Sequence, residues 1–206
     1  MFHSFKEAQR AAELMGADYA CLDEKDLNIF YDQRTLGKLM EFVRAANPSL
    51  VLTHSPVDYM VDHETTSRLC QTACFGAMAP NFRTGSRTAA KPLRWVPHLY
   101  YTEPFGGRDI LGQDIQATLF VDIKATFSRK EQMLACHESQ RAFLRAQQGI
   151  SDTLSMMKEM AERAGRSSGF GKAEGFRQHL GQGFPQNNLL GELLGDLALP
   201  IDSQEF

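Results

Sequence analysis

A buried strand that stops at a cluster of histidine and aspartate side chains is the feature that most constrains this chain. The strand is the apolar run Leu50–Thr53, and His54 follows at its carboxyl end. Pro56 prevents the strand from continuing, and a helical pattern opens at about Asp62. Ligands and catalytic groups of open α/β sheets gather in the crevice beyond such strand ends. We therefore expect a central, parallel strand with a functional site beside its end.

Helical and strand patterns alternate along the rest of the chain. Ser4 and Glu7 have capping-box spacing at the start of the first helix, and Gly16 can end that helix. Helices are predicted at residues 4–15, 34–46, 62–78 and 128–148, the last ending at Gly149, with further helical pieces beyond residue 151. Strands are predicted at residues 19–22, 50–53, 98–102 and 118–123.

This order of elements predicts an α/β fold with a Rossmann-like, mostly parallel sheet flanked by helices. A helix opens the chain where a strand is usual, so the first strand is expected to be missing. Residues 1–165 are predicted to form the main part of one domain. Residues 166–206 are predicted to be its C-terminal linker and docking helix, because Ser and Gly are frequent around residues 165–171.

Composition excludes several classes of function. With 206 residues, 43% of them apolar, the chain can bury one substantial core. A formal charge of -3 provides no basic stripe for nucleic acid. No apolar stretch approaches the roughly 20 residues of a membrane span, and a cytoplasmic location is expected. The four cysteines lack paired spacing, which favours reduced thiols over a cysteine zinc site.

Two interpretations are open for Asp62 and His63. Asp62 can cap the first turn of the predicted helix and orient the imidazole of His63, which would then suit Zn²⁺. Alternatively, Asp62 is an ordinary helix cap and His63 a solvated residue of the first turn. Two residues cannot specify a metal site.

The neighbouring residues His54, Asp58 and Tyr59 are predicted to form a pocket wall that contacts a polar substrate. His54 and Asp58 bracket Pro56 in the loop above the strand, so they can also be explained by a turn and a hydrogen bond within that loop. His137 lies in the predicted 128–148 helix, where a lone histidine is more often a packing residue than a ligand.

Two segments together resemble the LmbE/PIG-L family of zinc-dependent de-N-acetylases. They are residues 51–69, with Thr-His at the strand end and a later Asp-His, and residues 130–140, which end in His-Glu-Ser-Gln. The resemblance implies a Rossmann-like sheet, one Zn²⁺ with His63 as a ligand, and hydrolysis of an N-acetyl group. The implied substrate is a small-molecule N-acetylglucosamine-like conjugate. Asp62 is the implied catalytic neighbour of His63.

The sequence departs from the family pattern in its first motif. Relatives carry an early Ala-His-Pro-Asp-Asp that supplies two zinc ligands and the general base, and this sequence has no such motif. Met60 also stands where many relatives have an oxyanion-stabilising histidine, and Ser4 near a common arginine. Impaired hydrolysis is therefore expected, and an exposed sheet edge predicts association into homo-oligomers. The alternatives are a non-catalytic ligand-binding or assembly module, and a structural protein, each with a vestigial site.

Overall fold

The computed structural model describes residues 2–148 and 152–201, which fall into two compact units. Unit 1 combines Met1–Cys21 with Asp122–Glu174, and unit 2 combines Leu22–Val121 with Gly175–Phe206. The helices are α1 (Phe2–Met15), α2 (Gln33–Ala46), α3 (Val61–Gly76), α4 (Phe127–Ala135), α5 (Glu138–Gln148), α6 (Thr153–Ser168) and α7 (Leu189–Leu194), with 3₁₀ turns at Phe105–Gly107 and Gly195–Leu197. The strands are β1 (Leu50–Thr53), β2 (His98–Thr102), β3 (Leu119–Asp122), β4 (Ala173–Gln178) and β5 (Ala198–Pro200).

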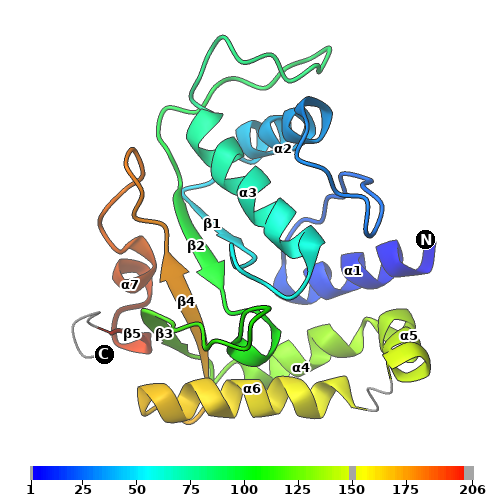
Figure 1. Ribbon diagram of the computed structural model, residues 1–206, viewed down its shortest axis with the longest axis vertical. Helices are drawn as coiled ribbons and strands as arrows, with labels where there is room; N and C mark the ends of the chain where they lie inside the picture. Colours follow the sequence, from blue (N-terminus) through cyan, green and yellow to red (C-terminus); the bar gives the residue numbers. More distant parts are fainter. Residues whose placement is uncertain (1, 149–151, 202–206) are drawn as a thin grey trace. The chain divides into compact units, whose positions relative to one another are not determined.

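The five strands form one mixed sheet in the order β1-β2-β4-β3-β5 (Figure 1). β1 and β2 are parallel, with Leu50 opposite His98 and Thr53 opposite Tyr101. β2 with β4 and β3 with β5 are antiparallel pairs. The predicted α/β class is confirmed. The predicted predominance of parallel strands is not, because the last two strands, β4 and β5, run antiparallel to β2 and β3.

β1 occupies an edge of this sheet, so the expectation of a central strand was wrong. Its parallel pairing with β2 was correct. Leu52 is 49% exposed, and Val51 and Leu50 are only partly buried. An apolar run of four residues indicates a strand, but it does not show how many neighbours that strand has.

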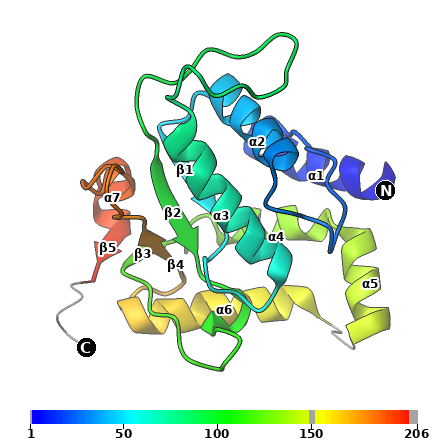
Figure 2. The same ribbon diagram turned by 45° about the horizontal axis from the view of Figure 1, so that its top comes forward.

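α2 and α3 lie side by side in unit 2, and α3 contacts the parallel strands β1 and β2 (Figures 1 and 2). Their contact is the buried apolar cluster that includes Met40 and Leu69. The side chain of Asp32 accepts a hydrogen bond from the N–H of Thr35 at the start of α2. The guanidinium of Arg44 donates to the carbonyls of Ala77, Ala79 and Phe82 beyond α3. These bonds satisfy backbone acceptors at and just beyond the C-terminal end of α3.

β2 and β4 provide the framework around a pocket in unit 2. Tyr100, Leu119 and Phe176 pack together as one buried cluster. The hydroxyl of Tyr100 donates to Asn188 Oδ1 and accepts from the N–H of Leu190, which fixes the start of α7 to β2. Within the predicted C-terminal segment, a short helix is present as α7.

In unit 1, α1 packs against α4 and α5. The helix predicted at 128–148 is two helices, because the chain breaks between α4 and α5 at Cys136 and His137. The carboxylate of Glu7 accepts bonds from the N–H and the hydroxyl of Ser139, at 2.9 and 2.6 Å, and so satisfies donors at the start of α5. Ser4 lies inside α1, not at its cap. Gly149, the predicted helix end, lies outside the described residues.

Two further predictions about the elements were wrong. Residues 19–22 form no strand. The segment predicted as a linker continues α6 to Ser168 and is followed closely by β4. No described helix combines the length and the apolar character needed to cross a membrane.

Candidate metal and substrate site

The loop between β1 and α3 is held in place by Asp58. One carboxylate oxygen of Asp58 accepts a hydrogen bond from the N–H of Met60 at 3.1 Å, which closes a turn just before α3. The N–H of Asp58 donates to Glu64 Oε1 at 3.1 Å in the first turn of α3. Asp58 is only 2% exposed. The backbone and the side chain of Asp58 therefore both attach the loop to the start of α3.

The same carboxylate oxygen of Asp58 lies 2.9 Å from His63 Nδ1. When neutral His63 donates its Nδ1–H to this carboxylate, the lone pair of Nε2 remains available for a ligand. The side chain of His63 is 28% exposed, so the imidazole ring reaches the surface of unit 2. Asp58 therefore performs the orienting role that the sequence suggested for Asp62.

His54 stacks on His63, with ring centroids 4.1 Å apart and planes 3° from parallel. Burial lowers the pKa of His54, the charge of His63 lowers it further, and Asp58 opposes the shift. His54 is therefore neutral at neutral pH, which is the form that binds metals. The predicted convergence of His54 and His63 beyond β1 is confirmed.

The donor set suits Zn²⁺ only in part. Ligand atoms of His54, Asp58 and His63 all lie within 4.8 Å of one another, and nitrogen and carboxylate oxygen are zinc ligands. However, a metal lies about 2 Å from an imidazole nitrogen and in the plane of its ring. Two parallel stacked rings cannot both meet that condition for one ion. The geometry therefore fits one ligand, His63 through Nε2, and His54 could join it only after its ring turns.

Asp62 contacts a different part of unit 2. Its carboxylate accepts a hydrogen bond from the N–H of Leu27, and the residue is 5% exposed. α3 begins at Val61, with Met60 as a cap residue whose side chain makes no capping bond. Asp62 therefore lies inside the first turn of α3 and fastens the loop around Leu27 to it.

Tyr59 lies on the rim of the cluster. Its ring meets the ring of His63 edge to face at 5.6 Å and that of Phe105 at 6.2 Å. Tyr59 is 56% exposed and Phe105 49%. Burial, followed by the charge of Asp58, raises the pKa of Tyr59, so its hydroxyl remains protonated. Phe105 was not identified from the sequence, because it lies in a loop far along the chain from Tyr59.

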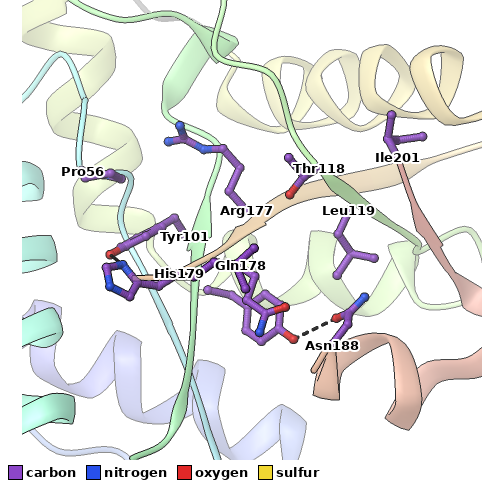
Figure 3. A pocket seen from close by; sticks show the side chains of 11 residues that line it. Pro56, Tyr101, Thr118, Leu119, Arg177, Gln178, His179, Asn188 and Ile201 are labelled. Atoms are coloured by element: carbon purple, nitrogen blue, oxygen red, sulfur yellow. Dashed lines mark hydrogen bonds between the residues drawn. The ribbon is translucent and has the colours of Figure 1, made fainter. Parts of the chain in front are cut away.

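A cavity of about 430 Å³ adjoins this loop, because Pro56 is part of its wall. Figure 3 shows Arg177 from β4 and the Tyr101–His179 pair beside it. Tyr101 and Arg177 are directly opposite each other in the β2–β4 pair, so their side chains share one face of the sheet. The hydroxyl of Tyr101 lies 2.8 Å from His179 Nδ1. The sequence patterns did not indicate Arg177 or His179, because β4 was not predicted.

Burial dominates the electrostatics of this cavity. It lowers the pKa of His179, so the imidazole is neutral at neutral pH, and it raises the pKa of Tyr101 to about 12. It also lowers the pKa of Arg177, while Tyr101 and Glu103 raise it. The pKa of a guanidinium lies so far above neutral that Arg177 stays charged despite this shift. Its Nη2 donates to the hydroxyl of Ser55, the residue after His54, at 2.7 Å.

Other residues singled out in the sequence lie in unit 1. Lys130 pairs with Glu174, and His137 occupies the junction of α4 and α5. Both are parts of that unit, whereas His54, Asp58, Tyr59, Asp62 and His63 are all in unit 2.

Comparisons with known proteins agree with the family resemblance. Residues 4–74 match the family model described as PIG-L: GlcNAc-PI de-N-acetylase. The 4-oxalmesaconate hydratase of Pseudomonas putida KT2440 is 29% identical over 136 residues, covering 66% of this chain and 50% of the hydratase. The chain thus spans about half the length of this curated relative. The resemblance to the LmbE/PIG-L family is confirmed.

Solved structures support the fold. A conserved protein from Thermus thermophilus has a TM-score of 0.66 at 24% identity, over 85% of this chain and 72% of that one. The N,N'-diacetylchitobiose deacetylase from Pyrococcus horikoshii has a TM-score of 0.65 at 19% identity, over 89% of this chain and 67% of that one. At these identities the likeness shows the fold alone.

Proposed function

We propose that this chain carries a metal-dependent, water-activating site of the LmbE/PIG-L type, with His63 as a zinc ligand. The observation that carries the proposal is the Asp58–His63 pair, in which a buried carboxylate fixes an accessible imidazole beside a second, neutral imidazole. When bound, a zinc ion would polarise a carbonyl and lower the pKa of its water. The family match over residues 4–74 supports the same class.

The proposed reaction is removal of an N-acetyl group from an N-acetylglucosamine-like conjugate, in a cytoplasmic setting. A deacetylase and a hydratase are among the similar proteins, and both reactions add water to their substrate. In this chain Tyr59 and His54 would line the substrate position, and Asp58 would hold the proton on Nδ1 of His63. Asp62 would act as a positioning residue for α3, because its carboxylate already accepts a bond from Leu27.

Turnover by residues 1–206 is proposed to be low. The geometry fits one zinc ligand, whereas a catalytic zinc site normally has three protein ligands. Asp58 and Asp62 are both buried and hydrogen-bonded, so neither is poised to take a proton from water. We propose that the chain forms homo-oligomers, because β1 is an edge strand of the described sheet and edge strands can pair with another chain.

Zinc binding and acetate release test this function. Zinc affinity is measured by competition with a chromogenic chelator for the wild type, His63→Ala and His98→Ala. The His98 variant is the matched control, since His98 is a histidine of β2 that bonds Asn187 instead of Asp58. We expect weak zinc binding that disappears only in His63→Ala, and acetate release from N-acetylglucosamine near background. Zinc binding unaffected by His63→Ala would rule out the assignment, and rapid, zinc-dependent acetate release would show that the site is complete.

The second candidate is a non-catalytic ligand-binding module. The cavity beside Pro56 favours it, because a cavity of about 430 Å³ can hold a small molecule without any metal. Saturable ligand binding in the absence of zinc, with no turnover in its presence, would support this candidate.

A further inference from the structure

We propose that the cavity between β2, β4 and α7 is a carboxylate-binding subsite in which Arg177 pairs with an acidic group on a small polar ligand. The cavity belongs entirely to unit 2, and among the described residues that line it Arg177 alone has a permanently charged side chain. Such a subsite needs no zinc, and it would serve an enzyme and a binding module equally.

Arg177 has hydrogen-bonding capacity to spare for a ligand. A guanidinium has five N–H donors in a planar fork, and the hydrogen bond that Arg177 makes within the described part of the chain is from Nη2 to the hydroxyl of Ser55. Burial lowers the pKa of Arg177 by more than Tyr101 and Glu103 raise it, so these neighbours do not make up for the lost water. A partly buried cation in this position gains from a further negative partner, and a ligand carboxylate would supply one.

The surroundings hold Arg177 in place before any ligand arrives. Its backbone is fixed by β-sheet pairing opposite Tyr101, and Ser55 holds one end of its fork. Ser55 is itself fixed, because it is fully buried and its hydroxyl donates to the carbonyl of Val57 at 2.6 Å. A preorganised fork loses little entropy when it forms a two-bond contact with a carboxylate.

The cavity wall also contains neutral polar groups near Arg177. His179 is neutral and bonded to Tyr101, and the Gln178 amide donates to the carbonyls of Pro185 and Asn187. These groups add polarity without adding negative charge. The cavity therefore favours a ligand with one acidic group over a cation. Its neutral wall suits the remaining polar part of the ligand.

Position links the subsite to the histidine cluster. Ser55 directly follows His54, and Pro56 lines the cavity. A ligand whose acid group binds Arg177 would thus lie beside the loop that carries His54 and Asp58. A carboxylate anchor at this place would select acidic substrates over neutral ones.

Isothermal titration of the chelator-treated full chain tests the subsite without metal. The probes are D-glucuronate, fumarate and inorganic phosphate, with D-glucose as the neutral control. We expect saturable binding of at least one carboxylate and none of glucose. Arg177→Gln should weaken that binding roughly tenfold or more, and Arg177→Lys should weaken it less, because lysine keeps the charge and loses the fork. Arg108→Gln is the matched control, since Arg108 is an exposed arginine of the same unit paired with Asp114.

Each outcome decides between explanations. Equal binding by the wild type and both Arg177 variants, or no binding of either carboxylate, would overturn the subsite. Phosphate binding without carboxylate binding would show that the cavity is a phosphate site and not a carboxylate site, which would also contradict the proposal. Circular dichroism and thermal unfolding identify a variant that fails to fold, and Arg177→Lys then supplies the comparison. Because no metal is present, this result is independent of whether His63 binds zinc.

Discussion

Replacing Asp58 separates its charge from its hydrogen bonds. The buried carboxylate accepts from both Met60 N–H and His63 Nδ1 through one oxygen. Asp58→Asn keeps an oxygen that can accept both bonds and removes the charge. Asp58→Ala removes the acceptor, leaves the Met60 N–H without this partner and releases the imidazole of His63. The two variants should therefore differ in both stability and zinc affinity.

The magnitudes follow from those two bonds. A hydrogen bond to a charged group contributes about 1.5–3 kcal/mol, and part of this is offset because the buried carboxylate was costly to desolvate. We expect Asp58→Ala to lower the free energy of unfolding by about 2–4 kcal/mol and Asp58→Asn by about 1 kcal/mol. Loss of the partner that orients a metal-binding histidine typically costs about 10–100-fold in metal affinity. Asp58→Ala should show that full loss and Asp58→Asn a smaller one.

Urea unfolding and chelator competition for zinc measure the two effects. Asp114→Asn is the matched control, because Asp114 is 64% exposed in the same unit and pairs with the equally exposed Arg108. It should change neither quantity. The reasoning fails if Asp58→Ala binds zinc as tightly as the wild type, or if Asp58→Asn is destabilised as strongly as Asp58→Ala.

Two further predictions concern pH and packing. Burial lowers the pKa values of His54 and His179 from 6.5, so below pH 6.5 these histidines bind protons more readily in the unfolded chain than in the folded one. The free energy of unfolding, measured by urea titration, should therefore fall as the pH drops from about 7.5 to 5.5. His179→Gln should show a shallower fall. A pH-independent wild type would contradict this. In α2, a Cβ on Gly37 would lie 2.6 Å from the carbonyl oxygen of Thr84. Overpacking costs about 1–3 kcal/mol, whereas the better helix propensity of alanine contributes at most about 1 kcal/mol. Gly37→Ala should therefore lower the melting temperature. A higher melting temperature would show that the Thr84 loop gives way.

The elements that local patterns define well could be predicted from the sequence. β1 and β2 have the predicted bounds, α2 differs by one residue at its start, and His54 and His63 meet where the strand end and the helix start required. In each case the signal lies within a few residues: an apolar run, a cap or a proline.

β4 could not be predicted because its sequence is shaped by distant contacts. Gly175 suggests a turn, yet a Cβ there would lie 2.8 Å from both Ala117 and Glu103, so the strand needs glycine for close packing. Missing β4 also meant missing Arg177 and His179, and with them the cavity. The sequence assigned the orientation of His63 to Asp62, whereas Asp58 performs it. Asp62 instead accepts a bond from Leu27, and a partner 35 residues away leaves no local pattern in the sequence.

The place of β4 between β2 and β3 also bears on the order in which the protein can fold as it is synthesised. β1, β2 and β3 leave the ribosome first, but β2 and β3 are not joined in the sheet until residues 173–178 have been made. The buried cluster of Tyr100, Leu119 and Phe176 is likewise incomplete until Phe176 has been made. Completion of the sheet must therefore come late, and β2 and β3 keep unpaired strand edges until β4 emerges. Such edges are sites of off-pathway association, so a pause in translation before β4 should favour aggregation.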